Sequence, residues 1–202
     1  MNLLWLSIYF AVLVWSGINP HDYLTWTLEV FPALIALVVL AATRRVFPLT
    51  PLVYQLILMH CVILMVGGHY TYAKVPVFDV VGRLLGVERN NYDKLGHFAQ
   101  GFVPAIVCRE ILIRKQIVKG RYWLNVIVVA FCLAISAFYE LLEWWTALAG
   151  GQAAESFLGT QGYVWDTQSD MAAAVVGAVA GLVLLGKTHD RQLNSSPMLK
   201  AP

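Results

Sequence analysis

Charged residues are scarce in this chain of 202 residues, where Asp, Glu, Lys and Arg together make up only 13%. Repeats, low-complexity segments and long polar stretches are also lacking, which leaves no room for a separate soluble domain. Hydrophobic residues make up 59% of the chain and the mean hydropathy is +0.66, both above the averages of soluble proteins. We therefore expect an integral membrane protein that is surrounded by the lipid bilayer and has no nucleic-acid partner.

Cysteines are few, and their placement excludes thiolate chemistry. Cys61, Cys108 and Cys132 lie inside apolar runs without metal-type spacing, so we expect buried thiols rather than disulfides or metal ligands. The first apolar segment also lacks the basic flank and the small-x-small cleavage site of a signal peptide. We expect it to remain in the protein as a helix.

Six apolar runs predict an all-α integral membrane protein with one transmembrane domain over residues 1–202. Each run is near the roughly 20 residues that a helix needs to cross the hydrocarbon core. The predicted spans are 3–18, 24–42, 52–68, 94–113, 123–143 and 168–186, and residues 187–202 form a predicted cytoplasmic tail. Five crossings remain an alternative if the third run does not cross fully.

The distribution of basic residues predicts the orientation. Ten of the 14 Lys and Arg lie at 44–45, 109–121 and 187–200, three regions that share one face when there are six spans. Short loops rich in Lys and Arg stay in the cytoplasm, so we expect both termini inside. The opposite, outer face receives ten of the 12 Asp and Glu and only four basic residues. Such an acidic face concentrates cations.

Three predicted spans each carry a pair of polar side chains near the outer face. The members of each pair are three or four positions apart and therefore share one side of a helix. The six candidate catalytic residues are Asp93, His97, Glu140, Glu143, Asp166 and Asp170. Ionisable groups at this depth are costly when they face lipid, so we expect them to converge on an interior cavity.

The residue types in this cluster also suit a metal. Carboxylates together with an imidazole are ligands for Mg, Mn, Fe or Zn. The candidate metal ligands are His97, Glu140 and Asp170, with His69 at the outer end of the third span as a further candidate. A divalent metal is thus the cofactor that the pattern indicates. Without a metal, crowded carboxylates favour proton transfer.

A structural interpretation competes with the functional one. Asp93 and Asp166 stand where helix N-caps are expected. Glu140 or Glu143 could instead form an ion pair with Lys94 or Lys74 between helices. In that case the polar cluster holds the bundle together and has no catalytic role.

Two segments outside the spans are expected to cover the outer face. Residues 75–90 have an amphipathic pattern too short to span, which predicts a helix in the outer interface. The segment 144–165 has four glycines and aromatic residues at both ends, which predicts a mobile lid. Within the bundle, Gly177 and Gly181 predict close helix packing, and His60 predicts a hydrogen bond between helices.

The segments YDKLGHFAQGF, YELLEWW and WDTQSDMAAAVVGAVAG together resemble the YjdF-like family of bacterial inner-membrane proteins, a domain family of unknown function. The likeness covers nearly the whole chain. A more distant similarity is to VanZ-like proteins, whose motifs are Asp-Lys-x-x-His, Glu-x-x-Gln and an Asp followed by Asn and Gly. The matching residues are Asp93, Lys94 and His97 for the first motif, Glu140 for the second, and Asp170 with Gly177 for the third.

The chain departs from the VanZ-like pattern at Glu143 in place of Gln, at Ala174 in place of Asn, and in lacking the Arg that usually precedes the final motif. The resemblance implies a bacterial plasma-membrane protein and, through glycopeptide resistance, envelope chemistry. We expect either an enzyme that uses metal-assisted or acid–base chemistry on an envelope or lipid-linked substrate, or a protein that binds or transports a cation or proton. Few polar residues continue inward below the cluster, which favours the enzyme.

Overall fold

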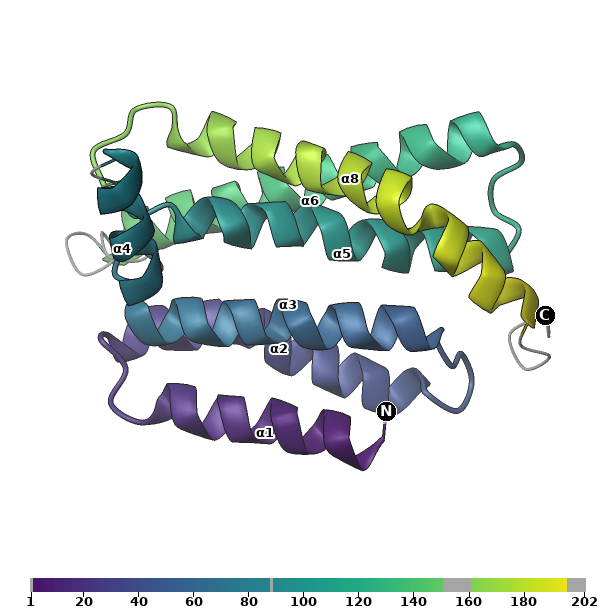
Figure 1. Ribbon diagram of the computed structural model, residues 1–202, viewed down its shortest axis with the longest axis horizontal. Helices are drawn as coiled ribbons and strands as arrows, with labels where there is room; N and C mark the ends of the chain where they lie inside the picture. Colours follow the sequence, from purple (N-terminus) through teal and green to yellow (C-terminus); the bar gives the residue numbers. More distant parts are fainter. Residues whose placement is uncertain (1, 88, 151–160, 196–202) are drawn as a thin grey trace.

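The computed structural model of the protein describes residues 2–87, 89–150 and 161–195. Within these ranges the chain folds into seven α-helices without a strand (Figure 1). They are α1 (Leu3–Gly17), α2 (Tyr23–Thr43), α3 (Pro51–Tyr70), α4 (Pro76–Leu85), α5 (Tyr92–Arg114), α6 (Arg121–Gly150) and α8 (Asp166–Ser195). The predicted all-α fold is confirmed.

Four of the described helices are long and apolar enough to cross a membrane: α2, α3, α6 over Arg121–Ala149, and α8. α1 is apolar but has 15 residues. α5 has 23 residues and carries five charged side chains, Asp93, Lys94, Arg109, Glu110 and Arg114. Contact with α3, α6 and α8 buries more than half of α5, so these charges are largely kept away from lipid.

Two helices run beyond the predicted spans. α6 continues from residue 143 to Gly150, because 144–149 contains neither Gly nor Pro to end it. The predicted lid over 144–165 is therefore wrong for residues 144–149, and its residues 151–160 lie outside the described ranges. α8 continues to Ser195, so the first part of the predicted tail over 187–202 is helical. The buried side chains of His189 and Leu193 hold this extension against the bundle.

The six long helices lie side by side in two groups (Figure 1). α1, α2 and α3 form the first group, α5, α6 and α8 form the second, and contact between α3 and α5 joins them. α4 lies across one end of the bundle, which we call the α4 end. α1 begins and α8 ends at the opposite end, which we call the terminal end.

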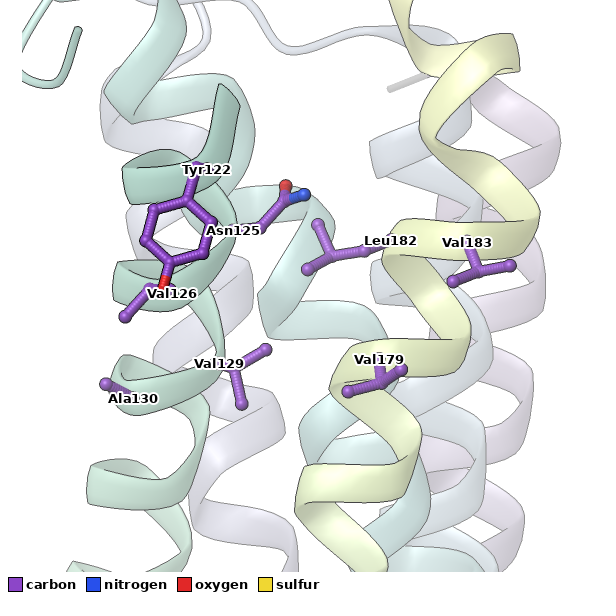
Figure 2. Close-up of a pocket in the computed structure, with 8 residues that line it drawn as sticks. All are labelled: Tyr122, Asn125, Val126, Val129, Ala130, Val179, Leu182 and Val183. Atoms are coloured by element: carbon purple, nitrogen blue, oxygen red, sulfur yellow. The ribbon is translucent and has the colours of Figure 1, made fainter. Parts of the chain in front are cut away.

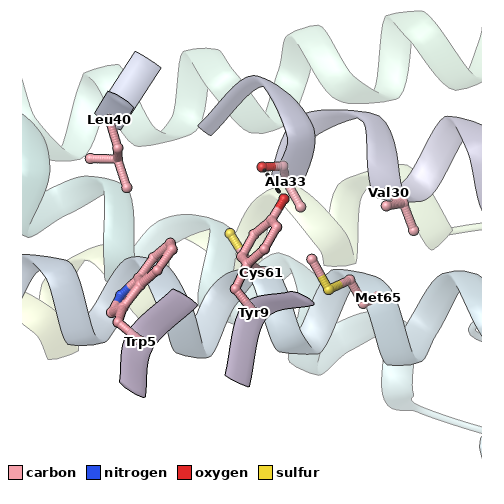
Figure 3. Close-up of a cluster of buried hydrophobic side chains, with 7 residues drawn as sticks. All are labelled: Trp5, Tyr9, Val30, Ala33, Leu40, Cys61 and Met65. Atoms are coloured by element: carbon pink, nitrogen blue, oxygen red, sulfur yellow. Dashed lines mark hydrogen bonds between the residues drawn. The ribbon is translucent and has the colours of Figure 1, made fainter. Parts of the chain in front are cut away.

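An apolar core between α1, α2 and α3 holds the first group together (Figure 3). Trp5 and Tyr9 of α1 stack with their ring centroids 5.4 Å apart and pack with Cys61 and Met65 of α3. The Tyr9 hydroxyl donates a 2.9 Å hydrogen bond to the carbonyl of Ala33 in α2. This bond satisfies a buried polar group and fixes α1 against α2. All three cysteines are buried and free, as the sequence predicts.

The second group depends on a close approach of α5 and α8. A Cβ atom at Gly101 of α5 would overlap the carbonyl of Ala174 in α8, and one at Gly177 would overlap the carbonyl of Phe98. A Cβ atom at Gly181 would also meet backbone of α5. The predicted packing role of Gly177 and Gly181 is confirmed, since the helices approach at a distance that a side chain would prevent. This contact places the first turns of α5 and α8 together at the α4 end.

α4 is the short helix expected between the third and fourth spans. It is capped at its C-terminus by Gly86, whose φ of +67° is readily adopted only by glycine. The side chains of Val77, Val80 and Leu84 are exposed, whereas Gly82 is buried. Exposed apolar side chains on a helix across the end of a bundle suit the membrane interface. The interfacial position itself stays a prediction.

Candidate functional site

The six candidate residues come together at the α4 end. α5 supplies Asp93 and His97, α6 supplies Glu140 and Glu143, and α8 supplies Asp166 and Asp170. None of them is more than 9% exposed. These six residues divide into two sets. Asp93, Asp166 and Asp170 form an ion-pair network with Arg89 and Lys94. His97, Glu140 and Glu143 form the second set, which we call the Glu–His cluster.

The ion-pair network connects the beginnings of α5 and α8. Lys94 Nζ lies 2.8 Å from Asp166 Oδ1 and 2.7 Å from Asp170 Oδ1. Arg89 Nη2 lies 2.5 Å from the same Asp166 oxygen and 3.4 Å from Asp93 Oδ2. Two bases thus balance most of the charge of three aspartates. Asp166 is also the first residue of α8, where the helix dipole favours an acid. Neither aspartate is the predicted N-cap, because Asn91 caps α5 and Asp166 already lies within α8, so their structural role comes from these ion pairs.

His97 lies between this network and the glutamates. Its Nε2 is 3.4 Å from Asp93 Oδ1, 3.7 Å from Glu140 Oε1 and 3.9 Å from Asp170 Oδ1. Its Nδ1 is 3.1 Å from Gln100 Oε1. Protonated His97 directs its Nε2–H at the carboxylates, whereas the neutral tautomer that donates Nδ1–H to Gln100 leaves the Nε2 lone pair available to a metal. Metal-binding histidines are commonly oriented by such a partner on the other ring nitrogen.

Glu140 and Glu143 lack the basic partners that the aspartates have. Among the described residues neither glutamate forms an ion pair with Lys or Arg. Glu140 Oε1 is buried and accepts no hydrogen bond from any of the described residues. A buried carboxylate without a counter-charge is costly. The pair is therefore stable at this depth only with a proton, carried by a glutamate or by the neighbouring His97, or with a bound cation.

Two sets of three residues could each hold a metal ion. They are Asp93, His97 and Asp170, and His97, Glu140 and Glu143, and in each set one ligand atom per residue lies within 4.8 Å of the others. In the first set, Lys94 already contacts Asp170 Oδ1. The second set has no Lys or Arg partner within the described ranges. The predicted ligands Glu140 and Asp170 both lie within 4 Å of His97, but each belongs to a different set.

A cavity of about 170 Å³ lies beside the Glu–His cluster. Its polar lining includes Glu29, His60, Asp93, His97, Tyr139 and Glu143. This volume is large enough for several water molecules or a hydrated cation, and smaller than a typical pocket for a whole organic ligand. The cavity therefore suits an ion, or one small group of a larger molecule.

Glu29 of α2 belongs to this site, although sequence reasoning did not select it. It is 5% exposed, and its Oε2 accepts a 2.8 Å hydrogen bond from the Tyr139 hydroxyl of α6. The Tyr139 ring centroid lies 6.2 Å from that of His97. A lone acid within an apolar span is itself a signal of function, and the sequence contained that signal. The partner could not be found, because Tyr139 is 110 residues away along the chain.

Two other histidines differ from expectation. The structure does not bring His69 to the cavity. Its Nδ1 lies 3.0 Å from the carbonyl oxygen of Ser16 and its ring packs on Trp15, so it joins α3 to α1. His60 does line the cavity, but its buried Nε2 has no hydrogen-bond partner among the described residues. The predicted hydrogen bond between helices is therefore absent at that atom.

A second buried polar network lies at the terminal end. Glu110 is fully buried and accepts hydrogen bonds from the Thr50 hydroxyl at 2.7 Å and from Arg114 at 2.9 Å. One of its oxygens also lies 3.0 Å from His189 Nε2. Because Glu110 is satisfied by partners from α5, α8 and the start of α3, this network joins helices rather than binding a ligand. Sequence reasoning did not predict it, since its members are 60 and 79 residues apart.

Sequence comparison relates the chain to a known family. The family model described as "Predicted membrane protein (DUF2238)" matches residues 1–191, which include both helix groups and all candidate site residues. The chain belongs to this family. It is 57% identical over 182 residues to the inner membrane protein YjdF of Escherichia coli (strain K12), and the match covers 90% of this chain and 87% of that protein. No solved structure matches.

The comparison confirms both the YjdF-like family and the location in the bacterial inner membrane. Several helices of membrane-spanning length make this DUF2238 member a multi-pass protein. The family match extends across α2, α5, α6 and the first turns of α8. The cavity and its buried acids therefore lie wholly within the region that the family model describes.

Proposed function

We propose that this protein binds a divalent cation between His97, Glu140 and Glu143 and uses it on the outer side of the inner membrane. The observation that supports this most directly is the charge of the two glutamates. Among the described residues no Lys or Arg balances it, whereas Arg89 and Lys94 serve the neighbouring aspartates. A divalent cation would neutralise both carboxylates and give Glu140 Oε1 the partner that it lacks.

The donor set suits a hard or borderline metal. Two carboxylates and one imidazole are a common ligand combination for Mn, Fe and Zn, and carboxylates also bind Mg. Three protein ligands leave positions open for water or substrate, as in catalytic metal sites. The cavity of about 170 Å³ provides the space for such a ligand next to His97 and Glu143.

This centre would support metal-assisted hydrolysis or acid–base chemistry. A bound cation acidifies a coordinated water molecule and polarises a phosphoryl or carbonyl oxygen. Glu29, hydrogen-bonded to Tyr139, lies on the same cavity and is placed to accept a proton. The cavity admits one small polar group, so an envelope lipid or lipid-linked molecule would present its phosphate or ester from the outer leaflet. The VanZ-like resemblance also points to envelope chemistry.

The proposal includes six crossings with both termini in the cytoplasm. α1 begins and α8 ends at one end of the bundle, which is consistent with an even number of crossings (Figure 1). The basic regions 44–45, 109–121 and 187–191 belong to that same terminal end. The α4 end, with the cavity and the acidic residues, is then on the outer side.

Metal content and thermal stability of the purified protein test this function. We expect stoichiometric divalent metal and a lower melting temperature after chelation. Glu143→Gln should lose the metal and the effect of the chelator, because a ligand stabilises only the state that binds it. Asp190→Asn is the matched control, since Asp190 is an acid of the terminal end that contacts Arg109 and Arg121. It should retain both the metal and the chelator effect.

Two results would contradict the proposal that a metal binds at this site. Equal loss of stability in Glu143→Gln with and without chelator would identify a structural cluster. Metal-free protein whose melting temperature does not respond to added Mg, Mn or Zn would leave protonated glutamates as the explanation for their burial.

Transport of a cation or proton is the second candidate, and the depth of the cavity favours it. The cavity reaches His60 and Pro104, which lie near the middle of α3 and α5. The buried Nε2 of His60 has no partner within the described ranges. Uptake of Mn²⁺ into proteoliposomes that is lost in Glu143→Gln would assign transport. Binding of Mn²⁺ to the protein without uptake into the proteoliposomes would instead identify a metal centre that does not transport.

A further inference from the structure

A groove of about 500 Å³ lies between α6 and α8 near the terminal end, away from the Glu–His cluster (Figure 2). Its walls are formed mainly by aliphatic side chains, among them Val126 and Val129 of α6 and Val179 and Val183 of α8. Val126, Val179 and Val183 are 41%, 46% and 72% exposed, so the groove opens to the outside of the bundle. In a membrane protein this surface faces lipid tails.

The α6 wall ends in polar groups at the terminal end. Arg121, Asn125 and Val129 are four positions apart and therefore follow one line along the helix. Asn125 lies in the groove about 6 Å deeper than Arg121, and its amide has no hydrogen-bond partner among the described residues. The Arg121 side chain is 70% exposed, and its contact with Asp190 is long at 3.5 Å. It therefore remains available to an anion.

The α8 wall ends in the same way. Val179 and Val183 line the groove, and Lys187 and Arg191 continue this line at the same four-residue spacing. Both basic residues are exposed. The apolar groove is thus bordered by cations from two helices at one end, with a polar amide just below them.

We propose that this groove binds an anionic phospholipid of the leaflet at the terminal end. One acyl chain lies against the valines between α6 and α8. The phosphate lies between Arg121 and Lys187, and the Asn125 amide donates to the ester region of the lipid. Basic pockets between transmembrane helices are a recognised kind of site for anionic lipid headgroups.

A second copy of the chain is a poorer fit to the same surface. It would enter the membrane with the same orientation, so its own Arg121 and Lys187 would lie at the same depth as those of the first copy. Like charges at one depth would repel across a symmetric contact. An anionic headgroup instead matches the charge of this border.

Native mass spectrometry of the protein in micelles with defined lipid tests the site. We expect phosphatidylglycerol to be retained on the order of tenfold better than phosphatidylcholine, with a preference that falls towards one in Arg121→Gln/Lys187→Gln. The control Arg44→Gln/Arg45→Gln removes two exposed charges at the terminal end, between α2 and α3, and should keep the preference. Ala130→Trp fills the groove and should reduce retention of both lipids.

Equal retention of the two lipids by the wild-type protein would overturn the proposal, as would an equal loss of preference in the control. A dimer that dissociates in Ala130→Trp without any lipid preference would identify a second copy as the occupant. Should the double variant fail to fold, Arg121→Gln alone is decisive, because that side chain is exposed and makes no buried contact.

Discussion

Lys94 is one of the two basic side chains that pair with the aspartates at the α4 end. Its ammonium group contacts Asp166 and Asp170 and its side chain is 22% exposed, so it serves two aspartates from a partly buried position. The glutamates of α6 receive no such contact from the described residues. The division of the acidic cluster into a balanced and an unbalanced part therefore depends on the positions of Arg89 and Lys94.

We predict that Lys94→Met destabilises the protein by about 3 kcal/mol, because it leaves the buried Asp170 carboxylate without its ammonium partner and Asp166 with Arg89 alone. Asp170→Asn in the same chain should recover part of this loss, since it removes one of the uncompensated charges. Unfolding in detergent of the two single variants and the double variant measures the coupling between them. Lys74→Met, which removes an exposed lysine of the same end that contacts His21, should change stability by less than about 0.5 kcal/mol. Additive effects of the Lys94 and Asp170 substitutions would contradict the ion pair.

The residues that sequence reasoning selected were those whose spacing along one helix revealed them. Asp93 with His97, and Glu140 with Glu143, share helix faces by their numbering alone, and the structure brings these pairs together. Glu29 was missed because its partner Tyr139 lies on another helix. Local spacing gives the face of a helix, whereas only tertiary packing determines which faces meet.

Among the helices, α5 and α8 have the contact that is most sensitive to side-chain size. The backbone of α8 lies against Gly101 of α5, whereas a Cβ atom added at Gly186 of α8 would have no neighbour within 4 Å. The two glycines are both helical and differ in their surroundings. They therefore separate the effect of packing from the effect of helix propensity.

We predict that Gly101→Ala destabilises the protein by about 1–3 kcal/mol, because the added methyl group would force α5 and α8 apart. Gly186→Ala should be neutral or stabilising by up to about 1 kcal/mol, since alanine favours the helix and meets no neighbour. Thermal unfolding of both variants in the same detergent compares them directly. A Gly101→Ala protein as stable as the wild type would show that the helices are not in close contact there.

Helix existence was easier to predict than helix length. The apolar runs located α1, α2, α3, α5, α6 and α8, but α6 and α8 continue well past residues 143 and 186. Hydropathy falls at those positions because the helices leave the apolar stretch. The backbone continues as a helix because nothing breaks it and because side chains such as His189 are buried by the bundle.

For the whole molecule, the main prediction is the orientation in the membrane. We expect a reporter that is active only in the cytoplasm to be active when fused to the C-terminus, because ten of the 14 Lys and Arg belong to that side. A reporter active only after export should be active when fused after Gly86, next to α4. Export of the C-terminal reporter would invert the bundle and place the acidic cavity on the cytoplasmic side.

The unequal lengths of the helices also affect the surrounding membrane. α1 has 15 residues and is about 22 Å long, whereas α6 has 30 residues and is about 45 Å long. A hydrocarbon core of about 30 Å matches neither of them. With α1 and α6 both crossing the membrane, as we propose, hydrophobic mismatch has opposite signs on the two flanks, so that lipids compress next to α1 while α6 tilts or thickens the bilayer beside it. The bilayer is then thinner beside α1 than beside α6, and this difference in thickness selects which molecules can lie next to each flank.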